Sequence, residues 1–402
     1  MKTAVSLVAI GQTLLWGGLY YIFPALLLDW EQSYGWSRPE MTFALALAVI
    51  VSALFAPIAG AQIDRGRGVL LLTGSALLGS LLLPLLPFAE NLTTFYLIWA
   101  AIGVAMAGCL YEPCFAFMVY YHGEQAKRSI TLVTLAAGFA STICFPAANY
   151  LSDLIGVDQT VRVIAAVLVF IAVPALGIGS HLMKNGSTLC CTAEPTTLSK
   201  STVIILKRPL FWFLAFGFSF MALNHGALLN HFLPLVRDRG LSAELSILAV
   251  SMIGPMQVAG RMVWMAFDKK LKLLQVTLAC FLSLTLASIA LWGSANWPVL
   301  IAAFVLLQGS AYGVVSIIKP LVAREVMGPG QLGKVTGLMA VPYLLCFALS
   351  PYAASLLWEE GGYDLVILAS TTCCLLSMGC LITVIRKHRT ETVSADPDKK
   401  PA

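Results

Sequence analysis

Charged residues are scarce in this chain. Only 11% of its 402 positions are Asp, Glu, Lys or Arg, whereas 59% are hydrophobic. A soluble fold of this size needs more polar side chains to cover its surface, so lipid must supply part of the solvent. The composition therefore excludes a soluble globular protein and indicates a membrane protein.

The sequence also lacks the motifs of nucleotide-driven or covalent chemistry. It has no Gly-x-x-x-x-Gly-Lys-Ser/Thr loop to hold phosphates, and no nucleophile and base stand together on a loop. Of the ten cysteines, only Cys190 and Cys191 lie outside apolar segments, and no histidine or second cysteine pair stands at ligand spacing from them. We therefore expect no enzyme activity, no cofactor and no metal.

Long hydrophobic runs are what the sequence does contain. A helix needs about 20 mostly apolar residues to cross the hydrocarbon core of a bilayer. Twelve such runs are found, at 4–28, 39–61, 69–88, 92–121, 129–151, 161–183, 209–236, 244–267, 271–293, 298–325, 335–357 and 364–386. The first is longer than the core of a signal peptide and continues into a second, so we expect it to be the first spanning helix.

The basic residues predict the orientation, because cytoplasmic loops carry an excess of Lys and Arg. Of the 25 basic residues, only Arg38, Arg162, Arg237 and Arg239 fall on the side opposite to the termini. Both termini are therefore expected in the cytoplasm, in a bacterial-type inner (plasma) membrane crossed many times. Topology explains the net charge of +5, so we expect no nucleic-acid partner.

The polar stretch 184–208 divides the chain into two sets of six helices. We predict an all-α membrane protein with an N-terminal bundle at 1–183, a cytoplasmic linker at 184–208, a C-terminal bundle at 209–386 and a cytoplasmic tail at 387–402.

A repeated spacing supports two related halves. Pro113 precedes Lys127 by 14 residues, and Pro320 precedes Lys334 by the same interval. The helices at 92–121 and 298–325 therefore correspond. Internal duplication is typical of alternating-access transporters, whose substrate site lies near the membrane midplane between the halves.

The run from Gly60 to Gly68 reads GAQIDRGRG and resembles the loop between helices two and three that marks the major facilitator superfamily. The resemblance implies twelve helices in two bundles and a monomer that moves a small molecule. It also implies that this loop latches helices on the cytoplasmic side through Gly60, Asp64, Arg65 and Arg67. Gly68 departs from the pattern, because the family usually has a basic residue there.

The run from Asn230 to Ser242 reads NHFLPLVRDRGLS, and Gly260-Arg261 follows it. Together they resemble the monocarboxylate-porter and oxalate/formate-exchanger-like branch of the superfamily. This resemblance implies a small anionic substrate, a monocarboxylate, held by Arg261, with protons as the coupling partner. Gln257 replaces the acid that the branch usually carries four residues before that arginine.

Only Glu112, Arg261 and Lys319 carry charge deep within the predicted spans. An arginine near the bilayer centre costs about 2.5 to 3.5 kcal/mol even on the milder insertion scale, so such residues face a partner or a watery cavity. The planar guanidinium of Arg261 suits a carboxylate. Glu112 and Lys319 hold equivalent places in the repeat, so we expect them to form a gate or to handle the coupling proton. A structural ion pair is the alternative for all three.

Other polar residues within the spans extend the predicted site. His225, Asn224, Gln257 and Tyr20 are predicted to contact the substrate, and His231 is predicted to serve in proton coupling or gating. Packing within the helix core is the alternative for each.

Two other functions stay open at this stage. A proton-driven exporter of a drug or other toxic compound would depend on Glu112 and leave Arg261 a structural role. A transporter-like sensor would need an added soluble domain, and neither 184–208 nor the segment after Lys387 is long enough to be one.

Overall fold

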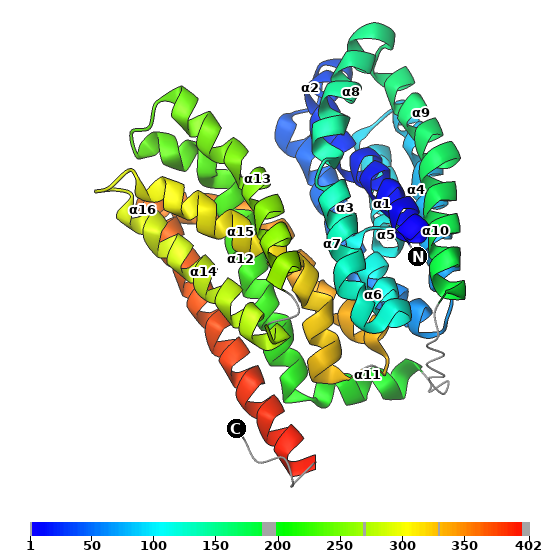
Figure 1. The fold of residues 1–402 in the computed structure, drawn as a ribbon. Helices are drawn as coiled ribbons and strands as arrows, with labels where there is room; N and C mark the ends of the chain where they lie inside the picture. Colours follow the sequence, from blue (N-terminus) through cyan, green and yellow to red (C-terminus); the bar gives the residue numbers. More distant parts are fainter. Residues whose placement is uncertain (1, 187–197, 268–270, 329, 396–402) are drawn as a thin grey trace. The chain divides into compact units, whose positions relative to one another are not determined.

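The computed structural model describes residues 2–186, 198–267, 271–328 and 330–395. Cys190 and Cys191, much of the predicted linker and the end of the predicted tail lie outside these residues. The described part of the chain is all-helical and separates into two compact units (Figure 1). Unit 1 comprises Met1–Thr196 and Gly330–Val341, and unit 2 comprises Thr197–Pro329 and Pro342–Ala402.

Unit 1 contains most of the shorter helical segments. In chain order they are α1 (Lys2–Trp16), the π-helix η1 (Gly17–Tyr21), α2 (Ile22–Tyr34), α3 (Arg38–Asp64), α4 (Gly68–Leu82), η2 (Leu83–Phe88), α5 (Leu92–Cys109), α6 (Tyr111–His122), η3 (Gly123–Gln125), α7 (Ala126–Ala137), α8 (Ala140–Ile155), α9 (Val157–Val167), the π-helix η4 (Leu168–Ala172), α10 (Val173–Asn185) and the first part of α16 (Leu332–Ala395).

Unit 2 contains longer uninterrupted helices. They are α11 (Leu198–Lys207), α12 (Pro209–Asp238), α13 (Ala243–Phe267), α14 (Leu273–Gly293), α15 (Leu300–Met327) and the rest of α16. The region predicted as linker thus contains the helix α11. The last helix runs to Ala395, beyond the predicted end of the span at residue 386.

Eleven helical stretches among the described residues are long and apolar enough to cross a membrane. The last of them, Leu332–His388, is interrupted at Gly361 and Gly362, whose backbone is not helical. The break divides it into two candidate crossing segments, which brings the candidates among the described residues to twelve. The prediction of an all-α, multi-pass membrane protein is confirmed.

The predicted helix at 92–121 is not continuous, because the backbone of Leu110 is extended between α5 and α6. Pro113 has no N–H and its ring crowds the carbonyl four residues earlier, so Cys109 loses its helical partner. The side-chain amide of Gln12 supplies the missing bond by donating to the Cys109 carbonyl at 2.7 Å. The helix predicted at 129–151 is likewise divided, between α7 and α8.

Glycines let helices of the same unit approach closely in lipid. In unit 2, α13 packs along α15, where Gly260 lies against the backbone of Ser310 and Gly313 against the backbone of Gln257. A side chain at either glycine would collide with the facing helix. This crossing brings the second half of α13, including Arg261, beside α15.

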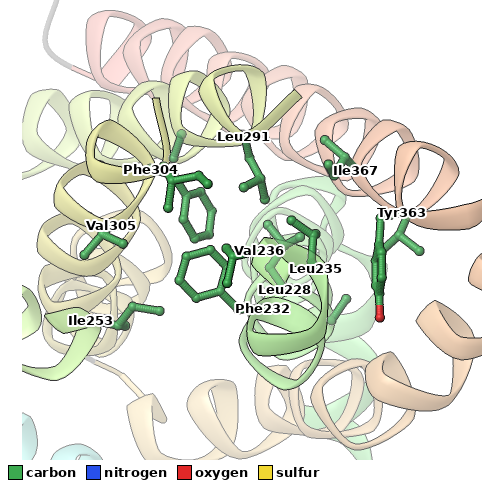
Figure 2. Packing of buried hydrophobic residues seen from close by; sticks show 14 of the residues in the cluster. Leu228, Phe232, Leu235, Val236, Ile253, Leu291, Phe304, Val305, Tyr363 and Ile367 are labelled. Atoms are coloured by element: carbon green, nitrogen blue, oxygen red, sulfur yellow. The ribbon is translucent and has the colours of Figure 1, made fainter. Parts of the chain in front are cut away.

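The core of unit 2 is an apolar cluster made by α12, α13, α14, α15 and α16. Figure 2 shows its aromatic centre, where Phe232 of α12 and Phe304 of α15 lie with their ring centroids 4.7 Å apart. Leu228, Leu291 and Ile367 belong to the same cluster and are fully buried. The cluster holds the helices that carry the polar residues described next.

Candidate functional site

A layer of buried polar residues lies one helical turn from the apolar cluster of unit 2. Four helices each contribute one polar residue to this layer. Each of these residues is three or four positions from a residue of the apolar cluster, so the two lie on the same face of their helix. The pairs are Asn224 with Leu228 on α12, Ser288 with Leu291 on α14, Gln308 with Phe304 on α15, and Ser370 with Ile367 on α16. Asn224, predicted to contact substrate, sits in this layer.

Hydrogen bonds connect the polar layer across the unit. The Asn224 amide nitrogen donates to the Ser288 hydroxyl at 3.1 Å and faces the Ser370 carbonyl at 3.5 Å. The Gln308 amide nitrogen donates to Asn224 Oδ1 at 3.2 Å and lies 3.4 Å from His225 Nδ1. Buried polar groups need such partners, so the layer orients Asn224 and His225 together.

His225 is 4% exposed and lies flat on the ring of Tyr312, with 3.3 Å between centroids and 13° between planes. The Tyr312 hydroxyl bonds the hydroxyl of Tyr343 at 2.9 Å. Lys319 is 7% exposed, and its Nζ lies 3.5 Å above the Tyr343 ring centre, where the ring face attracts a cation. Two predicted site residues, His225 and Lys319, are thus joined through two tyrosines.

Arg261 is also buried, with 7% of its surface exposed. Its Nε donates to the carbonyl of Gly313 at 3.0 Å, across the close crossing of α13 and α15. That bond uses one of the five guanidinium donors. Gln257 lies one turn earlier on α13, half-buried.

His231 lies further along α12 than His225 and has different surroundings. Its Nε2 is 3.0 Å from the carbonyl of Pro351 and 3.3 Å from the hydroxyl of Ser355, both on α16. The Tyr363 ring meets it edge-on at 6.2 Å. These contacts tie α12 to α16, and a role of His231 in proton coupling stays a prediction.

In unit 1, Asp64 caps the start of α16. The first backbone N–H groups of a helix have no partner within it. One Asp64 oxygen accepts from the N–H of Gly333 and the other from the N–H of Lys334, both at 2.7 Å. Gln331, which precedes the helix, is not one of the residue types that cap well, so the cap comes from α3.

The same contact depends on glycines on both helices. Gly60 of α3 and Gly333 of α16 lie backbone to backbone, and a Cβ on Gly60 would overlap the Gly333 carbonyl. One turn further, Gly337 also lies close to the Ala56 carbonyl. Gly60 and Asp64, both predicted latch residues, therefore act on one segment of α16.

Arg65 and Arg67, the other predicted latch residues, are exposed in the turn between α3 and α4. The structure gives a steric reason for Gly68, where the resembled family has a basic residue. A Cβ at this position would press on the ring of Phe117 in α6.

Glu112 lies in the first turn of α6 and lines a small cavity of unit 1 with Pro113, Gly60, Gly333 and Thr336. The cavity has room for about one water molecule. The cavity is therefore bordered by the carboxyl group of Glu112, which is predicted to handle the proton or the gate, and by the close contact between Gly60 of α3 and Gly333 of α16.

Tyr20 belongs to the π-helical segment of the first span. It packs edge-on against Trp16 and Tyr21 with 5.3 Å between centroids in both cases, and Trp16 also meets Tyr111 at 4.6 Å. π-helical turns are frequent at functional sites. The predicted contact of Tyr20 with the substrate stays a prediction.

Gln308, Tyr312 and Tyr343 were not singled out from the sequence. Gln308 and Tyr312 are four residues apart in an apolar run, and Lys319 follows seven residues later, so all three fall near one helix face. That spacing could have identified Gln308 and Tyr312 as candidates from the sequence. No sequence pattern identifies Tyr343, because only the fold brings it next to Tyr312. Among the described residues, no group of three or more His, Cys, Asp or Glu could hold a metal ion.

Comparisons with known proteins agree with this architecture. The sequence model of the Major Facilitator Superfamily matches residues 8–291. No curated protein matches the sequence.

Solved structures with the same fold share little sequence with this chain. A bacterial homologue of the iron transporter ferroportin, in an outward-facing state, is 16% identical with a TM-score of 0.73, covering 95% of this chain and 99% of that one. The Escherichia coli fucose:proton symporter is 14% identical with a TM-score of 0.70, covering 94% and 98%. The human organic anion transporter MFSD10 is 16% identical with a TM-score of 0.67, covering 94% and 99%.

Proposed function

The chain belongs to the Major Facilitator Superfamily of secondary transporters, and we propose that it moves a small organic anion, a monocarboxylate, by alternating access coupled to protons. The observation that carries this proposal is Arg261, a buried cation within a membrane-spanning helix. Solved relatives of the same fold include a fucose:proton symporter and an organic anion transporter. Proton coupling and organic anions are therefore both compatible with the architecture.

We propose that the guanidinium of Arg261 binds the anion. Its planar fork can give a carboxylate two parallel hydrogen bonds. The bond from Nε to Gly313 orients the guanidinium from one side. His225, Asn224, Gln257 and Tyr20 complete the proposed substrate contacts.

The remaining roles belong to the transport cycle. Glu112, Lys319 and His231 handle the proton or the gate, and Gly60, Asp64, Arg65 and Arg67 form the cytoplasmic latch. We place both termini in the cytoplasm and the monomeric chain in a bacterial-type inner membrane.

Arg261→Gln is expected to abolish uptake. Charge-assisted bonds to a buried ion contribute about 1.5 to 3 kcal/mol each, so losing the fork should weaken anion binding by roughly 100-fold or more. The measurement is uptake of a panel of radiolabelled monocarboxylates into proteoliposomes under an inward proton gradient. Arg237→Gln, the same substitution at an exposed position on α12, is the control and should transport like the wild type.

Saturable, gradient-dependent uptake that survives Arg261→Gln would remove this arginine from the site. If no carboxylate is transported, the next measurement is the resistance of cells that express the protein to toxic compounds. Resistance that depends on Glu112 and not on Arg261 would favour the proton-driven exporter instead.

The predicted pairing of Glu112 with Lys319 has its own test. Glu112→Lys and Lys319→Glu should each reduce transport at least tenfold, because each leaves two like charges where we expect opposite ones. The double variant should recover a substantial part of the activity if the two charges meet during the cycle. Failure of the swap to recover any activity, with normal protein levels, would leave the two residues with separate roles.

A further inference from the structure

Gln308 holds an unusual place in the polar layer of unit 2. Its side chain is 1% exposed, and its amide nitrogen lies 3.2 Å from Asn224 Oδ1 and 3.4 Å from His225 Nδ1. Its own Oε1 is buried without a partner within the described part of the chain. The NH₂ group of Gln308 is thus placed to hydrogen-bond its neighbours, whereas its carbonyl oxygen has no hydrogen-bond donor among the described residues.

The orientation of Gln308 follows from that of Asn224. The Ser370 carbonyl can only accept a hydrogen bond, and the Ser288 hydroxyl already donates to the Leu284 carbonyl. Asn224 must therefore turn its NH₂ group toward these two residues and its Oδ1 toward Gln308. If the Gln308 amide were reversed, its carbonyl oxygen would face Asn224 Oδ1 and no hydrogen could lie between them.

The protonation of His225 follows in turn. Because Gln308 presents N–H to the imidazole, Nδ1 must be the acceptor, and a neutral ring then carries its hydrogen on Nε2. A hydrogen on Nδ1 would set two donors face to face. The flat stacking on Tyr312 fixes the plane of the imidazole ring, so that Nδ1 stays directed toward Gln308.

We propose that Gln308 is a positioning residue that fixes His225 as the neutral Nε2–H tautomer, so that the imidazole offers a hydrogen-bond donor to the carboxylate of the substrate. The tautomer follows from the network alone. The donor role rests on the proposed function. Gln308 acts through His225 and needs no contact of its own with the substrate.

The tautomer is measured directly by nitrogen NMR of the purified full-length protein with ¹⁵N-labelled histidine. The chain has five histidines, and loss of one set of signals in His225→Gln assigns the ring. At neutral pH and without substrate, the wild type should show a protonated Nε2 and a bare Nδ1. The reverse assignment in the wild type alone overturns the proposal, whether or not any variant folds.

Gln308→Glu should change the tautomer, because a carboxylate can only accept. We expect a hydrogen to appear on His225 Nδ1, as the other neutral tautomer or as the imidazolium. Gln275→Glu makes the same substitution at an exposed position on α14, and it should leave the His225 signals as they are. An unchanged tautomer in Gln308→Glu would show that Gln308 does not set it.

Addition of the carboxylate panel separates the two claims. A shift of the His225 Nε2 signal by a transported carboxylate supports the donor role. If the wild type shows the expected tautomer but no carboxylate shifts it, the donor role fails together with the proposed substrate class, while the positioning role of Gln308 stands.

Discussion

Replacing Gly60 by alanine is expected to detach the first turns of α16 from α3. The added methyl group would take the place of the Gly333 carbonyl, and no rotamer relieves a clash between two backbones. Overpacking of a well-packed site costs about 1 to 3 kcal/mol, and a backbone clash lies at the upper end. The amides of residues 332–341 should therefore exchange with deuterium at least about 100-fold faster.

The control is Gly74→Ala in α4, where nothing beyond the adjoining backbone of its own helix lies within 4 Å of the new Cβ. Alanine is a better helix former than glycine, so neither variant should lose its helix content. Gly333→Ala should reproduce the effect from the other side, because its Cβ would meet the Gly60 carbonyl. Unaltered exchange in Gly60→Ala would contradict the described packing. Since we propose that this contact is part of the latch, uptake should fall in both disrupted variants.

Asp64→Asn is expected to release the same segment through loss of charge rather than through a clash. The carboxylate accepts from two first-turn amides, whereas an asparagine has one acceptor oxygen and places an NH₂ group against the second amide. The loss should be about 2 kcal/mol. The Gly333 and Lys334 amides, which have no helical partner of their own, should then exchange roughly 30-fold faster.

Asp153→Asn, at an exposed position in α8, provides the matched control and should leave exchange at Gly333 and Lys334 unaltered. Asp64→Asn and Gly60→Ala should not be additive, because both act on one contact. Full additivity would mean that the glycine packing and the carboxylate cap hold α16 independently.

Much of the fold could be predicted because lipid imposes a simple rule on the sequence. Each crossing helix needs a long apolar run, and all twelve predicted runs correspond to helical segments. The breaks within the runs were harder to predict. Pro113 alone predicts a disturbed helix, but the extended Leu110 persists because Gln12, 97 residues away, bonds the carbonyl that the proline leaves free.

Candidate site residues could be selected from the sequence where burial of the side chain costs free energy. Arg261, Glu112 and Lys319 stood out because charge is expensive inside a membrane. Gln308 and Tyr343 did not stand out, since uncharged polar residues occur in apolar helices for many reasons. Their contacts are with partners that lie far away in the sequence, such as Asn224, which is 84 residues from Gln308.

The sequence by itself determined the membrane environment, the helices and the buried charges, because these depend on local composition and on the free energy of transfer to lipid. Only the tertiary structure decided which groups meet. Asp64 lies 269 and 270 residues from the amides it accepts from, and the His225 tautomer depends on four different helices. Hydrogen bonds are short and directional, so their partners are chosen by the packing of whole helices and cannot be read from any one segment.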